Sequence, residues 1–403
     1  MKRNPLTANL TKAFIESNIP QEDIMSKYLN IDKDIIINCI ENNTLIRSIF
    51  RDDDRDASMG FAYNKHGKLK VRDFGGAGQF MDIYDVVAYV LSVAYERPIN
   101  TSNKRDFYFI LSHIYKTFSK QIDNKELNKV DSEIKNALIK VKKRRPIIEL
   151  VPRSWNKSDK EYWNSLGVSL GYLNTHFVIP VEQYYIDRGV NTEPKYYYKQ
   201  KDPCYAYMLG QNRAGIHFIK LYFPKRNRTT ELKFITNCNV LEGLLNLELN
   251  NYDYILITKS SKDRLSIGCH LDSLPFYGGA QAKLNIGVVN LPCEGYHLTE
   301  KEYSWLTNKL APNGKLISLL DFDYTGRMGA KYMYDTYNIP YLFITRGEFG
   351  LPNYGSKDFA ELHDKYTIKE INQFINETIT YVKLRFSGTS DTTSDLSGLP
   401  YFE

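Results

Sequence analysis

The sequence predicts a mixed α/β protein in which a parallel sheet with flanking helices follows a β-rich region and a small helical and β-stranded module. Three observations support this class, α/β in its sheet and α+β overall. Four apolar segments in the last third of the chain alternate with helical stretches, which is typical of a parallel sheet covered on both faces. Strand-like runs broken by Pro, Gly and Asn fill the middle. The opening residues have the apolar spacing of short helices.

Composition places the chain among globular proteins. It has 403 residues, enough for two or three cores, with 42% hydrophobic and 25% charged residues. No apolar run reaches the roughly 18–20 residues of a membrane span, and the start MKRNPLTANLTKAF lacks the apolar core of a secretory signal. Five scattered cysteines without a C-x-x-C pair argue against a zinc site and a disulfide scaffold. A cytoplasmic location is therefore expected, with no membrane partner.

The positions of the charged residues are more informative about binding partners than the net charge of +6. Residues 140–146 (KVKKRRP) and 223–233 (FPKRNRTTELK) concentrate cations, and the chain holds 31 tyrosines, many beside basic residues. A basic surface with aromatic rings suits phosphate contacts and base stacking. A solvated surface is an equally good interpretation of any one of these runs.

The first part of the chain divides into a helical, a β-stranded and a second helical stretch. Residues 1–45 predict short polar helices, and residues 46–80 predict short strands with a glycine cluster. An amphipathic helix is expected over 81–96. Residues 104–145 are helical in pattern and increasingly basic, and Pro146 marks a linker between modules.

The α/β alternation begins at about residue 246, after a β-rich stretch over 147–245, and a polar tail, 381–403, is expected to be disordered. The four predicted strands are DYILIT (253–258), NIGVVNLP (285–292), KLISLLDFD (315–323) and IPYLFIT (339–345). Helices are predicted between them over 261–271, 299–310 and 325–337.

Three polar clusters follow these strands: TKSSKD (258–263), DFDYTGR (321–327) and GSKD (355–358). Ligands of open parallel sheets bind outside the carboxyl ends of the strands. Asp321 and Asp323 project to the same side, because side chains alternate along a strand. Two carboxylates there suit Mg²⁺ or Mn²⁺, ions that promote in-line phosphoryl transfer. The alternative is structural: Asp323 caps the next helix and Asp321 pairs with Arg327.

Taken together, these clusters resemble the Toprim domain of bacterial and phage primases, topoisomerases and related nucleases. That family has E-G-x-x-D after its first strand and D-x-D after a later one. Asp321 and Asp323 match D-x-D, with Gly326 and Arg327 in the expected turn. The other matches are Asp263, as the last position of the first motif, and the pair Lys357 and Asp358.

The first motif departs from the family at Lys259 and Ser260, which stand where the family has glutamate and glycine. A protonated ammonium group cannot act as a general base or a metal ligand. Lys259 could instead neutralise a triphosphate or stand as a cation beside the two aspartates. The resemblance to phage primase-like proteins implies a T-K-S-x-K-D subfamily form, so loss of activity does not follow from this substitution.

Residues 48–80 resemble the N-terminal zinc ribbon of bacterial primases. Ser48 and Arg51 occupy the Cys and His positions, and Asp73 with Gly75 and Gly76 replaces the second ligand turn. No set of four nitrogen and sulfur ligands remains, so zinc is not expected. A module this small needs other support, which packing against flanking helices would supply. The alternative is an unrelated glycine-rich β-turn.

The segment 215–248 resembles the basic subdomain of primases, whose surface holds the template strand and the nucleoside triphosphate. Lys233 falls on that subdomain's motif lysine, with Asn237 beyond it. A solvated hairpin is the alternative interpretation of residues 225–228. Further cations expected on this surface are Arg213, Lys220, Lys225, Arg226 and Arg228.

The resemblance covers roughly residues 46–375 and implies a DNA primase of phage type that synthesises RNA primers on single-stranded DNA. The expected domains are a helical and metal-free zinc-ribbon-like DNA-binding module (1–100), a basic helical linker (101–146), a basic subdomain (147–245), a Toprim domain (246–380) and a tail (381–403). Asp321, Asp323, Lys259 and Asp263 would be catalytic. Mg²⁺ or Mn²⁺ would be held by Asp321, Asp323 and Asp358. Nucleic acid and nucleotide would contact the basic-subdomain cations, Arg327 and Lys357.

Two other functions fit the same residues. One is a catalytically inactive, primase-derived protein that binds single-stranded DNA or adapts a helicase, and the other is a Toprim nuclease. No G-x-x-x-x-G-K-[ST] phosphate loop occurs in the chain, so a separate replicative helicase is the expected partner. The ending DLSGLPYFE is similar to the docking tips of single-strand-binding proteins; a tail without function is the alternative. A phage-encoded chain would act in the host cytoplasm.

Overall fold

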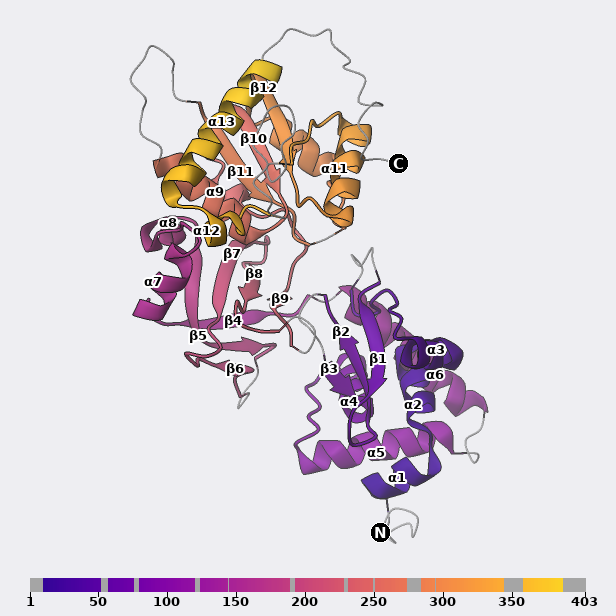
Figure 1. The fold of residues 1–403 in the computed structure, drawn as a ribbon. Helices are drawn as coiled ribbons and strands as arrows, with labels where there is room; N and C mark the ends of the chain where they lie inside the picture. The colour runs from indigo at the N-terminus through magenta and orange to yellow at the C-terminus, as the bar shows by residue number, and fades with distance from the viewer. Residues whose placement is uncertain are drawn as a thin grey trace. The chain divides into compact units, whose positions relative to one another are not determined.

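The computed structural model describes residues 10–51, 57–75, 80–119, 124–143, 145–188, 193–227, 231–248, 251–273, 284–293, 295–343 and 358–386 (Figure 1). The chain forms two compact units. Unit 1 comprises Met1–Ser154 and Ile179–Asn239, and unit 2 comprises Trp155–Val178 and Val240–Glu403. The side chains of residues 141–144, within the basic run 140–146, and all of the C-terminal DLSGLPYFE lie outside the described residues.

Unit 1 begins with short helices whose ends are fixed by polar side chains. The side chain of Thr11 accepts a hydrogen bond from Phe14 N, and that of Asp32 accepts one from Asp34 N. Asn30 ends its helix in the left-handed conformation. These helices are α1 (Lys12–Asn18), α2 (Gln21–Leu29) and α3 (Lys33–Asn42).

A small antiparallel sheet with strand order β1-β2-β3 follows the helices. A capping box at Asp82 and Asp85 starts the next helix directly from the last strand. The elements are β1 (Met59–Tyr63), β2 (Leu69–Asp73), β3 (Phe80–Asp82), α4 (Ile83–Ala94), α5 (Lys104–Phe118) and α6 (Asn124–Lys143).

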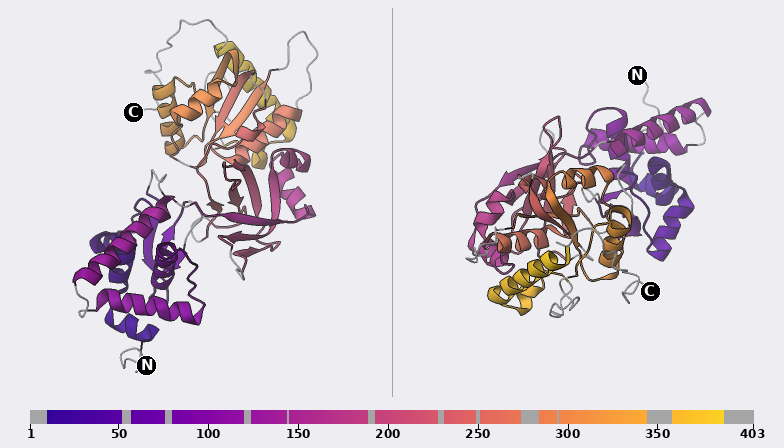
Figure 2. Two further views of the ribbon diagram at one scale, coloured as in Figure 1. Left: turned by 180° about the vertical axis from the view of Figure 1, so that it is seen from behind. Right: turned by 90° about the horizontal axis from the view of Figure 1, so that it is seen from above.

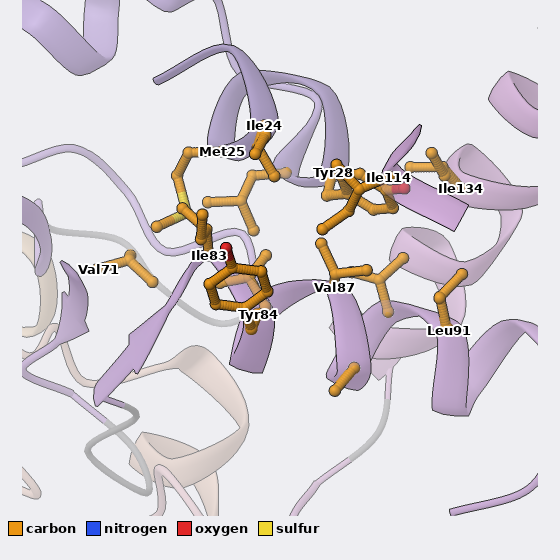
Figure 3. Packing of buried hydrophobic residues seen from close by; sticks show 14 of the residues in the cluster. Ile24, Met25, Tyr28, Val71, Ile83, Tyr84, Val87, Leu91, Ile114 and Ile134 are labelled. Carbon is orange, nitrogen blue, oxygen red and sulfur yellow. The ribbon is translucent and has the colours of Figure 1, made fainter. Parts of the chain in front are cut away.

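One hydrophobic core joins these helices and strands. Tyr28 of α2, Val71 of β2 and Val87 of α4 are fully buried in it, beside Ile114 of α5. Figure 3 shows these side chains converging from separate elements. The flanking helices thus contribute apolar contacts that a sheet of this size cannot provide by itself.

A second sheet of unit 1 has the order β4-β5-β7-β8-β9, with β6 paired to β5. Its β7–β8 and β8–β9 pairs are antiparallel. Ala206, Ile219, Leu221 and Ile235 share one face and belong to one buried cluster. The strands are β4 (Ile148–Pro152), β5 (Val178–Ile186), β6 (Tyr196–Tyr197), β7 (Tyr205–Gln211), β8 (His217–Tyr222) and β9 (Phe234–Thr236).

Unit 2 contains a three-stranded sheet of order β11-β10-β12, in which both strand pairs are parallel. Two helices from within 147–245 also belong to this unit. The elements are α7 (Lys157–Asn164), α8 (Leu170–Thr175), η2 (Leu244–Asn246), β10 (Tyr252–Thr258), α9 (Ser261–Ser273), β11 (Ile286–Asn290), α10 (Glu300–Thr307), β12 (Leu310–Leu319), α11 (Tyr324–Tyr337), α12 (Leu362–Lys365) and α13 (Ile368–Phe386).

Alternate residues of this sheet pack into two different cores. Ile255 and Ile257 of β10 belong to the core that includes Leu306 of α10 and Met333 of α11. Tyr254 of β10 and Ile317 of β12 belong to a second core, which includes residues of α9, α12 and α13. Helices therefore lie on both sides of the sheet, as the two views of Figure 2 also show. The predicted mixed α/β class with a helix-flanked parallel sheet is confirmed.

Of the fourth predicted strand, 339–345, the structure describes residues 339–343. Among the described residues, Tyr341 forms one isolated parallel bridge with Ser318, beside β12. Ser318 N donates to the carbonyl of Pro340, and Leu342 N donates to that of Ser318. No helix in the described part of the chain is long and apolar enough to cross a membrane.

Candidate active site

Two adjacent parallel strands, β10 and β12, place a lysine next to two carboxylates. Thr258 and Leu319 are paired at the ends of β10 and β12, so the residues that follow them meet at the same sheet edge. Lys259 Nζ lies 2.8 Å from Asp321 Oδ2 and 3.4 Å from Asp323 Oδ2. The local sequence favours this arrangement because each apolar strand ends directly in a polar turn.

This ion-paired cluster is largely removed from solvent. The side chains of Lys259 and Asp321 are 11% and 10% exposed, whereas that of Asp323 is 29% exposed. Burial raises the pKa of Asp321, and the hydrogen bond and charge of Lys259 oppose that rise. The ammonium group therefore compensates the cost of placing a carboxylate at the buried end of β12.

Asp323 also starts the following helix. Its Oδ1 accepts a hydrogen bond of 2.8 Å from Gly326 N, which makes it the N-cap of α11. A Cβ atom at Gly326 would collide with the carbonyl oxygen of Asp321, so the turn requires glycine. The ion-pair partner of Asp321 is Lys259, while the guanidinium group of Arg327 lies 5.5 Å from the centre of the Phe322 ring.

Asp263 and Asp358 lie beside this cluster. Asp263 accepts hydrogen bonds from Ser260 Oγ at 2.6 Å and from Ala360 N at 3.1 Å, which ties the turn after β10 to residues near α12. Asp358 accepts one from Glu361 N at 3.0 Å. Burial, and then the charges of Asp358 and Asp321, raise the pKa of Asp263 to about 7. Lys357 lies outside the described residues.

The donor chemistry of the cluster fits a hard divalent cation only in part. Mg²⁺ is commonly bound by one or two carboxylates together with substrate phosphates, and Asp321 and Asp323 would be those carboxylates. Within the described ranges no group of three His, Cys, Asp or Glu side chains is arranged to hold a metal ion. The remaining ligands would come from phosphate and water. Lys259 contacts one oxygen of each carboxylate.

The predicted nucleic-acid-binding cations of the basic subdomain belong to unit 1, around β7, β8 and β9, whereas Arg327 lies on α11 of unit 2. Arg226 pairs with Asp202 at 2.7 Å and stacks on Phe223, so it holds the chain after β8. Lys220 is buried, with its Nζ 5.1 Å from the centre of the Phe234 ring. Three further cations of this group lie in turns or just before a strand: Arg213, Lys225 and Lys233. Arg228 falls outside the described residues.

Asn237 follows β9, and its side chain binds the backbone of β8. Its side-chain oxygen accepts from Ile219 N at 2.8 Å, and its amide nitrogen donates to the carbonyl of His217 at 2.8 Å. Phe234, next to Lys233, is 42% exposed and stacks on the Tyr222 ring with 5.1 Å between centroids. Composition could suggest aromatic residues here, but only the β8–β9 register places Phe234 against Tyr222.

A polar cluster occupies the region that resembles a zinc ribbon. Asp73 is 2% exposed and accepts hydrogen bonds from Ser48 Oγ at 2.6 Å, Arg51 Nε at 3.2 Å and Gly75 N at 3.0 Å. Ser58 completes it by contacting both Arg51 and Asp73. The zinc-ribbon resemblance identified Ser48, Arg51 and Asp73, but no motif in the sequence pointed to Ser58. Gly76 lies outside the described residues.

No protein-family model matches the chain, and neither does any curated protein. Among solved structures, the primase fragment of the bacteriophage T7 primase-helicase protein is 15% identical, with a TM-score of 0.34 over 60% of this chain and 84% of that chain. The RNA polymerase domain of Mycobacterium tuberculosis primase DnaG is 11% identical, with a TM-score of 0.32 over 72% of this chain and 82% of that chain.

A third similar chain belongs to a structure of the bacteriophage T7 lagging-strand DNA polymerase interacting with primase domains of two gp4 subunits bound to an RNA/DNA hybrid and dTTP. It is 15% identical, with a TM-score of 0.32 over 56% of this chain and 97% of that chain. The chain therefore has structural similarity to primase domains at low sequence identity. Similarity of this degree assigns neither an activity nor a role to any residue.

Proposed function

We propose that this protein is a primase-type nucleotidyltransferase that joins ribonucleotides on a single-stranded DNA template. The observation that supports it most is the convergence of Lys259, Asp321 and Asp323 at the carboxyl edge of the parallel sheet. Ligands of such sheets bind at that edge. The Toprim-like spacing of Asp263, Asp321 and Asp358 supports the same reaction class.

In this proposal each side chain acts on the triphosphate or on its neighbours. The 3′ hydroxyl oxygen of one nucleotide bonds to the α-phosphorus of the next and loses its proton to solvent, while the bond from that phosphorus to the α,β-bridging oxygen breaks and pyrophosphate leaves. Asp321 and Asp323 would hold Mg²⁺ or Mn²⁺, which neutralises charge on the phosphates during such a transfer. Lys259 would bind a phosphate oxygen, and Asp358 would add a carboxylate. Asp263, through Ser260 and Ala360, would position the turn that bears Lys259.

Template binding is assigned in this proposal to the cations of unit 1. Lys233, Arg213 and Lys225 would contact phosphates, and the exposed Phe234 ring offers a face for a base. A separate helicase and a single-strand-binding protein are proposed as partners in replication.

A second candidate function follows from the same ion pair. Lys259 engages both aspartates, as expected of a primase-derived protein that has lost catalysis and binds single-stranded DNA or a helicase. A Toprim nuclease would use the same carboxylates. The zinc-ribbon-like module and the basic sheet, which suit template handling, weigh against cleavage.

The test is to incubate the full chain with single-stranded DNA, labelled ribonucleoside triphosphates and Mg²⁺ or Mn²⁺, and to resolve the products by size. Short labelled oligoribonucleotides that require the template support primer synthesis. Template binding without any product supports the adaptor, and shortened DNA supports the nuclease.

A further inference from the structure

The candidate active site already contains a cation that belongs to the chain. Lys259 Nζ lies within hydrogen-bonding distance of Asp321 Oδ2 and approaches Asp323 Oδ2. Two carboxylates and one ammonium group leave a net charge of about −1 where the aspartates alone would give −2. With the Lys259 and Asp321 side chains only about one-tenth exposed, the attraction is stronger than it would be in bulk water.

We propose that Lys259 excludes free divalent ions from the Asp321–Asp323 pair, and that the site accepts Mg²⁺ or Mn²⁺ only as a complex with a nucleoside triphosphate. This inference rests on the proposed function, because it specifies the substrate form that the same site takes. The ligand class is a divalent metal–triphosphate complex.

The geometry opposes a free ion for two reasons. A Mg²⁺ ion needs carboxylate oxygens at about 2.0–2.1 Å, and the ammonium group already contacts one oxygen of each aspartate. A second cation among these oxygens would also lie a few ångströms from Lys259 Nζ, where like charges repel strongly in a poorly solvated site. Asp323 has its other oxygen on Gly326 N, so capping of α11 competes for that position too.

A triphosphate removes both obstacles. Its oxygens supply the metal ligands that the described side chains lack, and its negative charge offers Lys259 a new partner. The turn that bears Lys259 is fixed by the Ser260–Asp263 hydrogen bond of 2.6 Å, so the exchange needs only rotation of the flexible lysine side chain. The ammonium group then moves from carboxylate to phosphate as the metal enters.

The test measures binding of Mn²⁺ to the full chain from the electron paramagnetic resonance signal of free Mn²⁺. The wild type is compared with Lys259→Met, which removes the charge and keeps an unbranched side chain of similar length. The control is Lys331→Met, because Lys331 pairs with Asp335 at 2.7 Å on the exposed side of α11. We expect Lys259→Met to bind Mn²⁺ at least about tenfold more tightly than the wild type, and Lys331→Met to match the wild type. Adding Asp321→Asn to Lys259→Met should abolish the gain.

The second arm measures binding of α,β-methylene-ATP by calorimetry. The wild type should bind the nucleotide at least about tenfold more tightly with Mn²⁺ than with EDTA, although it binds Mn²⁺ weakly alone. Wild-type affinity for Mn²⁺ alone equal to that of Lys259→Met would overturn the proposal. If Lys259→Met does not fold, a rise in the wild-type thermal midpoint with Mn²⁺ alone contradicts it, and an unchanged midpoint supports it. None of these readouts depends on primer synthesis, so the proposed reaction can fail separately.

Discussion

At the scale of single residues, Asp73 of unit 1 is a buried carboxylate that accepts several hydrogen bonds. It is almost fully buried and is compensated by Arg51, whose side chain is 21% exposed. We expect Arg51→Met to lower the free energy of unfolding by about 1–3 kcal/mol, because a buried charge loses its charged partner. Urea denaturation measures the change. EDTA should not alter the urea denaturation curve of the wild type, because hydrogen bonds to Asp73, and no zinc ion, hold the turn in this region.

The matched control is Lys140→Met. Lys140 pairs with Glu96 at 2.7 Å, but both side chains are mostly exposed, and such pairs contribute about 0–1 kcal/mol. Equal losses in the two variants would contradict a supporting role for the Asp73 cluster, as would unfolding of the wild type by chelation.

A second residue-scale prediction concerns pH. The pKa of Asp263 is raised to about 7 in the folded chain, against about 3.9 in an unfolded one. Between these values the folded state keeps a proton that the unfolded state releases, so the free energy of unfolding falls as pH rises from about 4 to about 7. Asp263→Asn removes this dependence and retains groups that can pair with Ser260 and Ala360.

We therefore expect Asp263→Asn to gain stability relative to the wild type by on the order of 1–3 kcal/mol between pH 5 and pH 8. Burial lowers the pKa of His113 and His363 to about 4, and these groups destabilise the folded chain as pH falls below about 6.5. Both proteins contain them, so their effect cancels in the difference. A difference in stability that is flat with pH, by denaturation at each pH, would refute the assignment.

At the scale of elements, Asp323 has two roles at the start of α11. Its side chain caps the helix, and its negative charge contributes to the candidate active site. Asp323→Asn keeps an oxygen that can accept from Gly326 N and removes the charge, whereas Asp323→Ala removes both. We expect Asp323→Ala to lose about 0.5–2 kcal/mol more than Asp323→Asn in the free energy of unfolding, and both to lose metal–nucleotide binding. Chemical denaturation and calorimetry separate the two roles. Normal metal–nucleotide binding by Asp323→Asn would show that its charge is not needed.

The same element shows how far the sequence could predict the site. Apolar strands ending in polar residues were sufficient to predict that Lys259, Asp321 and Asp323 lie at one sheet edge. The sequence left two roles open for Lys259, a triphosphate contact or a cation beside the two aspartates, and the ion pair itself depends on the register that places Thr258 beside Leu319. The described part of the fourth predicted strand, 339–343, has one bridge to β12, at Tyr341, made by the carbonyl of Pro340 and the N–H of Leu342 with Ser318. Pro340 has no N–H group to donate to β12, which gives a local reason for this limited pairing.

At the scale of the whole molecule, the two units are not consecutive in sequence. The segment 155–178 joins unit 2 through contacts such as Ser266 Oγ with the carbonyl of Leu166 at 2.6 Å. Asn246 also donates to the carbonyl of Thr175 at 3.2 Å. Apolar spacing reports local structure, so the sequence grouped residues 155–178, which contain α7 and α8, with the surrounding stretch 147–245. Long-range contacts of this kind decide unit membership and leave no periodic signal.

We propose phosphate and metal chemistry for unit 2 and template binding for unit 1, and above all that Asp321 and Asp323 catalyse primer synthesis. The most direct measurement is template-dependent incorporation of labelled ribonucleotides by the wild type, by the Asp321→Asn/Asp323→Asn double variant and by Lys331→Met, with template binding measured in parallel by fluorescence anisotropy. We predict incorporation by the wild type and Lys331→Met, and at least about a hundredfold loss in the double variant with template binding unchanged. Undiminished incorporation by the double variant, or none by the wild type with either metal, would contradict the account.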